Sequence, residues 1–339
     1  IFIVAGTGLL KPNISAIVGT LYTPEDKRRD AGFSIFYMGI NTGAFIAPLI
    51  CGWLAQSETF RGFLSSMGLS PEHAWHWGFG AAGVGMTLGV IQYVIGAKQL
   101  AETPVVNRDP NPGLLWLKFG AALALVAGLL YGLWDYRDYL ILLGTFIFAG
   151  WFVAQTEPGI ERKRAYAVLI LFVFAGLFWA GFEQAGSSLN LFGDRFTNNE
   201  IFGMSFPSSF HQSTNSVFLI LLAPVFAWLW LRLANTGKEP SSPVKFALGL
   251  LFVGAGFAVI AIAARISAAN GDAMVGPGWL TTVYLLHTIG ELCLSPVGLS
   301  TMTKLAPARL AGSIMGVWFM ATSLGNFIGG RVAGQFAKP

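Results

Sequence analysis

Residues 279–303 read WLTTVYLLHTIGELCLSPVGLSTMT, a stretch that is apolar and long enough to cross a membrane as a helix. Glu291 is the only Asp, Glu, Lys or Arg in this stretch and lies near its middle. An ionisable side chain at the centre of a membrane helix costs about 2.5–3.5 kcal/mol on insertion scales, so it marks a functional site by default. The stretch therefore predicts a membrane-spanning helix that carries a functional carboxylate.

The composition extends this prediction to the whole chain. The 339 residues are 54% hydrophobic and 11% charged, with a mean hydropathy of +0.61, whereas soluble domains are about one quarter charged. We therefore expect an all-α polytopic membrane protein with ten spans. The expected spans are 1–21, 33–55, 75–97, 114–134, 139–154, 165–191, 207–231, 246–264, 279–303 and 311–334.

Two further ionisable residues lie inside apolar stretches. Lys11 follows ten uncharged residues, and Glu183 follows the uncharged run 165–182. We expect both to be functional, because charges within spans are too costly to be kept for packing alone. Two alternatives stay open: Lys11 could extend its ammonium group to the membrane interface, and Glu183 could form a permanent hydrogen bond between helices.

Basic residues gather in alternate connections between the expected spans. Because positive residues are enriched in cytoplasmic loops, these connections are expected on the cytoplasmic side. The net charge of +4 is therefore explained by the basic residues of the cytoplasmic loops, and we expect no nucleic-acid partner. The residues that define the cytoplasmic side are Lys27, Arg28, Arg29, Lys98, Arg108, Arg162, Lys163, Arg164, Arg232, Lys238, Lys245, Lys304 and Arg309.

Glycine and proline also lie inside the expected spans. Membrane helices approach closely where small residues face one another, so we expect the glycines of span 75–97 to pack against a neighbouring helix. The alternative is that glycine and proline are simply common in membrane helices. The glycines concerned are Gly80, Gly83, Gly85 and Gly89, and the prolines inside the expected spans are Pro12, Pro48, Pro224 and Pro296.

Four ordered motifs resemble those of the proton-dependent oligopeptide transporters. They are GTGLLKPNIS at 6–15, FYMGINTG at 36–43, FWAGFEQ at 178–184 and GELCLSPVGLS at 290–300. The resemblance implies a major-facilitator fold in the bacterial inner membrane. It also implies that the chain is a fragment running from family helix 4 to helix 11, without the acidic and arginine-bearing motif of helix 1.

The resemblance further implies a division of the chain into three parts. Residues 1–97 would be the C-terminal part of the N-terminal bundle (helices 4–6), and residues 165–339 the C-terminal bundle (helices 7–11). Residues 98–164 would be a linker that contains the additional helix pair of bacterial members. The implied function is proton-coupled symport of di- and tripeptides into the cell by alternating access.

A short peptide is a zwitterion with variable side chains, so its site should bind the two termini by charge and leave room between them. We expect Lys11 to bind the carboxylate end. By the family resemblance, Glu291 would face the amino end. Glu183 is the first proton-carrier prediction, because a carboxyl group that alternates between burial and a cationic partner changes its protonation state. Glu291 is the second, in exchange with Lys11.

Further polar and aromatic residues are predicted to complete the site around these three charges. By the family pattern, Asn41 and Asn215 would hydrogen-bond the peptide backbone, while Ser295 lies one turn beyond Glu291 on the same helix face. An interhelical polar contact is the alternative for each. The rings expected to form the pocket walls are those of Tyr37, Trp179 and Trp318. His287, one turn before Glu291, could relay protons or simply be a hydrogen-bonded core residue.

Two other functions stay open. A transporter of another anion, such as nitrate, would share the scaffold. A membrane-embedded enzyme would need a metal or nucleophile constellation, but His73 and His76 are too sparse, and Cys51 and Cys293 lie apart without metal-ligand spacing. We therefore expect no enzymatic activity and no cofactor, with protons as the coupling ion and peptides, protons and membrane lipid as partners.

Overall fold

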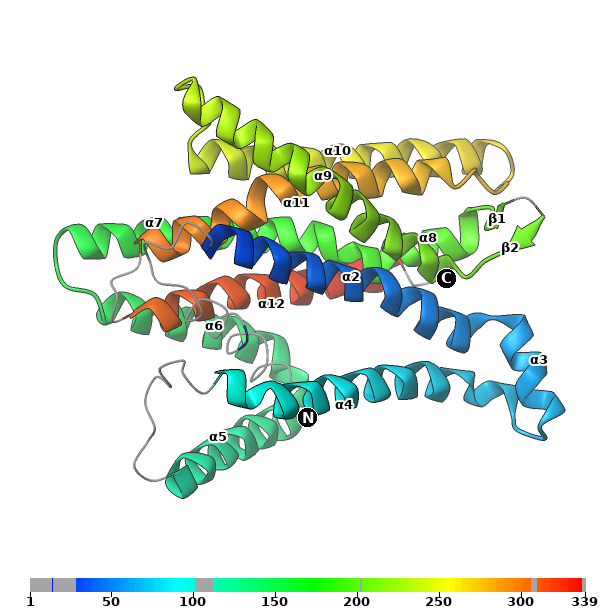
Figure 1. Cartoon of the computed structure of the whole chain (residues 1–339), viewed down its shortest axis with the longest axis horizontal. Coiled ribbons are helices and arrows are strands. Elements are labelled where there is room, and N and C mark those ends of the chain that lie inside the picture. Colours follow the sequence, from blue (N-terminus) through cyan, green and yellow to red (C-terminus); the bar gives the residue numbers. More distant parts are fainter. Residues whose placement is uncertain (1–13, 15–28, 101–111, 202, 306–309, 337–339) are drawn as a thin grey trace. The chain divides into compact units, whose positions relative to one another are not determined.

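The computed structural model of the chain describes residues 14, 29–100, 112–201, 203–305 and 310–336, and these residues are almost entirely helical (Figure 1). The expected span 1–21, including Lys11, lies outside the described residues except for Ile14, which is helical. Within the described part, the only sheet is a two-stranded antiparallel hairpin that pairs Glu200 with Ser205 and Ile201 with Met204. The predicted all-α fold class is confirmed.

The helices begin and end close to the limits of the expected apolar stretches. They are α2 (Arg29–Gln56), α3 (Glu58–Ser66), α4 (Ala74–Leu100), α5 (Pro112–Gly132), α6 (Arg137–Ala154), α7 (Ile160–Phe182), α8 (Ser188–Phe196), α9 (His211–Asn235), α10 (Ser242–Ala269), α11 (Gly278–Leu305) and α12 (Ala311–Phe336). The 3-10 turns are η1 (Pro71–His73), η2 (Trp134–Tyr136), η3 (Glu183–Gly186) and η4 (Ser208–Phe210), and the strands are β1 (Glu200–Ile201) and β2 (Met204–Ser205).

Five helical stretches of the described residues are long and apolar enough to cross a membrane, with mean hydropathies from 1.2 to 2.5. Two shorter apolar helices, Trp116–Leu129 and Asp138–Ala154, lie between them in sequence. The protein is therefore a multi-pass membrane protein. The five stretches are Pro71–Gly96, Ile160–Phe196, Ser208–Trp230, Ser242–Ala269 and Gly278–Leu299.

The chain divides into two compact units, each formed by two sequence segments. One unit comprises Ile1–Phe36 and Gln92–Tyr166, and the other comprises Tyr37–Ile91 and Ala167–Pro339. The second unit holds every described residue of the predicted site. The expected division into two bundles and a linker at residues 97 and 164 stays a prediction.

The expected span 165–191 is not one continuous helix. Helix α7 ends at Phe182, the chain tightens into the 3-10 turn η3, and α8 begins only at Ser188. Ser187 lies outside helical geometry, with φ −135° and ψ −96°. Glycine disfavours the helix, and serine side chains offer the backbone alternative hydrogen bonds, so Gly186 and Ser187 weaken the helix at this point. The expected span thus lies within the candidate span Ile160–Phe196, but its helix is interrupted at η3.

Helices α10 and α11 run side by side and pack backbone against backbone (Figure 1). A Cβ atom built on Gly290 would lie 2.8 Å from the carbonyl oxygen of Gly249, and one built on Gly249 would lie 3.0 Å from Leu294 Cβ. Only glycine allows this approach, as is usual where membrane helices meet through small residues. This close contact, the Gly290–Gly249 seam, fixes the backbone of α11 immediately before Glu291.

The glycines of α4 that were expected to pack closely have no neighbour among the described residues. Within that part of the chain, a Cβ atom on Gly80, Gly83, Gly85 or Gly89 would meet no other atom within 4 Å. The residues around them on α4 are largely exposed. Their packing against another helix therefore stays a prediction, because glycine content shows that a helix could approach another closely but does not supply the neighbour.

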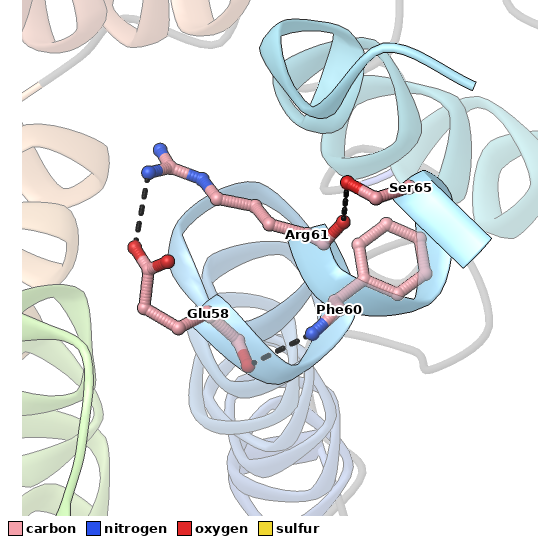
Figure 2. Close-up of polar contacts among 5 residues, drawn as sticks. Glu58, Phe60, Arg61 and Ser65 are labelled. Atoms are coloured by element: carbon pink, nitrogen blue, oxygen red, sulfur yellow. Dashed lines mark hydrogen bonds and ion pairs between the residues drawn. The ribbon is translucent and has the colours of Figure 1, made fainter. Parts of the chain in front are cut away.

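The connection between α2 and α4 forms the short helix α3, which the sequence analysis did not predict. Figure 2 shows its polar contacts: Arg61 Nη1 lies 3.2 Å from Glu58 Oε1, and the Ser65 hydroxyl donates to the Arg61 carbonyl oxygen at 3.1 Å. An exposed ion pair of this kind contributes little stability. Phe60 and Leu64 are buried in a cluster with Ala74, so apolar packing is the main support of α3.

Helix α2 meets the turn η4 and the first turn of α9 through small and polar residues. The Ser209 hydroxyl donates to Gln56 Oε1 at 2.8 Å, and the Ser213 hydroxyl donates to the Phe45 carbonyl oxygen at 2.9 Å. Gly52 is buried between these contacts, and a Cβ atom there would overlap the Ser209 side chain. Under the predicted topology, the bond to Gln56 lies at the extracellular end of α2, and Ser213 lies in the first, extracellular turn of α9.

Candidate functional site

Glu291 is buried in the described structure, with only 7% of its surface exposed. It lies in the middle of α11, directly after the Gly290–Gly249 seam and before Pro296, which lies inside the same helix. A carboxyl group at this depth needs polar partners, because lipid and apolar side chains cannot solvate it. The residues around it therefore define the site.

Asn215 on α9 provides one of these partners. Its side-chain nitrogen donates to Glu291 Oε2 at 3.3 Å and to the Thr288 hydroxyl at 2.9 Å. Thr288 is fully buried and in turn donates to the Tyr284 carbonyl oxygen at 2.7 Å. The structure thus joins two predicted site residues, Asn215 and Glu291, although they are 76 positions apart.

Thr288 belongs to this network and was missing from the sequence-based prediction. It precedes Glu291 by three positions, so both side chains lie on one face of α11. That spacing is a signal that could have identified it. Carboxylate, amide and hydroxyl oxygens gathered in this way are suited to accept hydrogen bonds from an ammonium group.

Ser295 extends the same face of α11 by one turn. It is 5% exposed, and its hydroxyl has no hydrogen-bond partner within the described part of the chain. A buried hydroxyl without a partner costs free energy that a bound ligand could recover. The geometry places Ser295 on the predicted face, while its role in binding stays a prediction.

Glu183 occupies the first position of η3, where the α7 helix gives way to the 3-10 turn, and is partly buried. Trp179 lies one turn earlier and packs edge-on against Phe178 and Phe182, with ring centroids 5.4 Å and 5.3 Å away. The indole nitrogen of Trp179 is buried without a hydrogen-bond partner among the described residues. Glu183 is therefore positioned at a break in a membrane helix, beside an aromatic cluster.

The remaining predicted residues lie on other elements. Asn41 is buried on α2, and Tyr37 lies in the same helix. Trp318 on α12 is 3% exposed; its ring covers Gly298 and lies 6.4 Å from the Phe246 ring. The functional roles of these residues, and that of Lys11 outside the described range, stay predictions.

His287 does not face Asn215 but points toward α10 and α7. Its ring covers Gly256 and lies 5.3 Å from the Phe257 ring and 6.2 Å from the Phe182 ring. It is 1% exposed. These aromatic surroundings favour a packing role over a relay to Glu291, because no chain of polar groups is seen between the two in the described structure.

Solved structures support this arrangement of helices. A crystal structure of a peptide transporter POT mutant in complex with alafosfalin superposes with a TM-score of 0.78 at 38% identity, over 98% of this chain and 67% of that one. A POT family transporter in complex with 5-aminolevulinic acid gives a TM-score of 0.77 at 30% identity, over 98% of this chain and 69% of that one.

Sequence comparisons agree with the structural ones. The chain is 40% identical to a peptide transporter of Yersinia enterocolitica, over 99% of this chain and 67% of the relative. It is 32% identical to a di-/tripeptide transporter of Lactococcus lactis subsp. cremoris, over 98% of this chain and 68% of that protein. The chain thus spans about two-thirds of the length of these relatives. The POT family model matches residues 1–119 and 136–339, so this chain belongs to the POT family.

Proposed function

We propose that the full-length protein imports di- and tripeptides together with protons, by alternating access across the bacterial inner membrane. The observation that carries this proposal is the buried Glu291 carboxylate, bonded to Asn215 across two helices, in a chain of the POT family. In this proposal, Glu291 and Asn215 bind the amino end of the peptide. Lys11 binds its carboxylate, and Tyr37, Asn41, Trp179, Ser295 and Trp318 complete the site.

The same proposal assigns proton transfer to Glu183 first, with Glu291 and Lys11 as an alternating pair. Protons are the coupling ion, and no other cofactor or enzymatic step is needed. Within the described residues, no three His, Cys, Asp or Glu side chains gather as a metal site would require. The relatives named as peptide transporters support the choice of cargo.

The function is tested with full-length protein in proteoliposomes. Under an inward proton gradient we expect uptake of labelled dialanine, which unlabelled trialanine competes for and nitrate does not. Collapse of the gradient with a protonophore should end accumulation but leave exchange. Competition by nitrate without competition by peptides would instead favour the anion transporter that shares this scaffold.

Asn215 offers a prediction at the site itself. Asn215→Ala removes the donor to Glu291 and Thr288, and a hydrogen bond to a charged group is worth about 1.5–3 kcal/mol. We expect the KM for dialanine to rise by about tenfold or more. Asn270→Ala is the matched control, because Asn270 is exposed and bonds only to its own helix in the described structure. An unchanged KM in Asn215→Ala would remove this residue from the site.

A further inference from the structure

Gln184 lies in the break between α7 and α8, next to Glu183, and only 2% of its surface is exposed. Its side-chain amide has two donor hydrogens and an oxygen that can accept two hydrogen bonds. All four possibilities are used in the structure. This buried amide thus uses all its hydrogen-bonding positions at a point where the membrane helix is irregular. The presence of a polar residue in the sequence does not by itself explain such an arrangement.

Three of the four bonds hold the break together. The Gln184 nitrogen donates to the Ala180 carbonyl oxygen at 3.1 Å, near the end of α7. The Gln184 oxygen accepts from the Ser187 hydroxyl at 3.2 Å and from the Ser188 hydroxyl at 2.7 Å, where α8 begins. Polar groups that an interrupted helix leaves in a membrane must find partners within the protein. The Gln184 side chain therefore connects both ends of the interruption.

The fourth bond ties the break to a different helix. The Gln184 nitrogen donates to the Gly329 carbonyl oxygen on α12 at 2.9 Å, across 145 positions of sequence. A Cβ atom on Gly329 would lie 3.0 Å from the Ala180 oxygen and 3.1 Å from the Gln184 nitrogen. This contact thus depends on a glycine at position 329.

The approach of α12 to α7 continues one turn earlier. A Cβ atom on Gly325 would lie 2.6 Å from Trp179 Cβ and 2.8 Å from the Gly176 carbonyl oxygen. The backbones of α7 and α12 are therefore in contact from Gly176 to the break. The hydrogen bond from the Gln184 amide to Gly329 lies at the end of this contact, next to Glu183. A shift of α12 relative to α7 would act directly on the backbone of η3.

We propose that Gln184 is a positioning residue for proton coupling: its amide clamps the α7–α8 break to Gly329 of α12 and so fixes the backbone that carries the Glu183 carboxyl group. The inference rests on the proposed function, in which Glu183 carries the proton. Gln184 itself does not titrate and exchanges no proton. Its loss frees the carboxyl group to move from its place, so that peptide can cross without a proton.

The test uses full-length protein in proteoliposomes and compares two rates: accumulation of labelled dialanine driven by a proton gradient, and peptide exchange without a gradient. Gln184→Leu removes all four bonds, and Ser188→Ala removes the shortest of them. Gly329→Ala disturbs the same clamp from α12. Ser323→Ala is the control, because Ser323 is exposed on α12 and bonds to its own helix.

For Gln184→Leu and Gly329→Ala we expect the ratio of accumulation to exchange to fall by about tenfold, since small displacements of a reacting group have effects of this size or greater. Ser188→Ala should show a smaller fall, and combining Gln184→Leu with Gly329→Ala should add little. Ser323→Ala should match the wild type. If Gln184→Leu does not fold, Ser188→Ala and Gly329→Ala still decide the question.

An equal fall in accumulation and exchange, or an unchanged ratio in all three variants, would overturn the positioning role. Glu183→Gln is measured in parallel. If it uncouples transport while the clamp variants stay coupled, only the role of Gln184 fails. If Glu183→Gln itself stays coupled, the assignment of Glu183 as proton carrier fails, whatever the clamp variants show.

Discussion

Glu183→Gln is expected to abolish proton-driven accumulation of peptide while leaving peptide exchange intact. Glutamine has nearly the same shape as glutamate and can hydrogen-bond, but it cannot release a proton. One proton charge that moves down 100 mV releases about 2.3 kcal/mol, which supports roughly fortyfold accumulation of a neutral zwitterion at about 1.4 kcal/mol per tenfold. The variant should lose this entire gain and bring peptide only to equal concentrations on both sides.

Uptake and counterflow in proteoliposomes measure the two activities separately. Glu200→Gln is the matched control, because Glu200 is exposed in strand β1, and it should accumulate peptide normally. If the Glu183→Gln protein still concentrates peptide against a gradient, the proton passes elsewhere. In that case Glu291, which the structure places in the Asn215 network, becomes the group to test.

Gly290→Val is expected to have the largest effect on stability. The valine Cβ would lie 2.8 Å from the Gly249 carbonyl oxygen, which belongs to the backbone and cannot rotate away. The helices α10 and α11 would have to separate, at a cost of about 3 kcal/mol or more for overpacking of this kind. Most of the protein should fail to fold, and any remainder should melt at a lower temperature.

Size-exclusion profiles and thermal unfolding in detergent measure this effect. Gly254→Val, on α10, is the control, because a Cβ atom there meets no atom of the described residues within 4 Å. That variant should keep the wild-type profile. A Gly290→Val protein that melts at the wild-type temperature would show that α10 and α11 do not need their close approach.

The sequence predicted helices far better than it predicted their interruptions. Apolar length identified 246–264 as a span, whereas α10 runs from Ser242 to Ala269, because a helix continues into the polar interface beyond the apolar run. The break after Phe182 was not predicted. Its tie to α12 is the bond from Gln184 to Gly329, a partner so distant in sequence that no local pattern reveals it.

The site, too, could be predicted from the sequence only in part. Glu291 stands out in an apolar stretch because of the cost of its charge, and this could be recognised from sequence alone. That Asn215 donates to it depends on how α9 packs against α11, which hydropathy does not determine. Conversely, Gly80, Gly83, Gly85 and Gly89 on α4 are typical of a helix contact, but none of them meets another atom within 4 Å among the described residues.

The hydroxyl contacts that α2 makes with η4 and with the start of α9 cost little free energy to break. Under the proposed alternating-access cycle, the bonds from Ser209 to Gln56 and from Ser213 to Phe45 must break whenever the extracellular end opens. Water can replace each partner, and such a bond is worth only about 0.5–1.5 kcal/mol net. Gly52 keeps the interface small, so little apolar surface is wetted on opening. These contacts therefore add only a small free-energy barrier to opening and closing of this end.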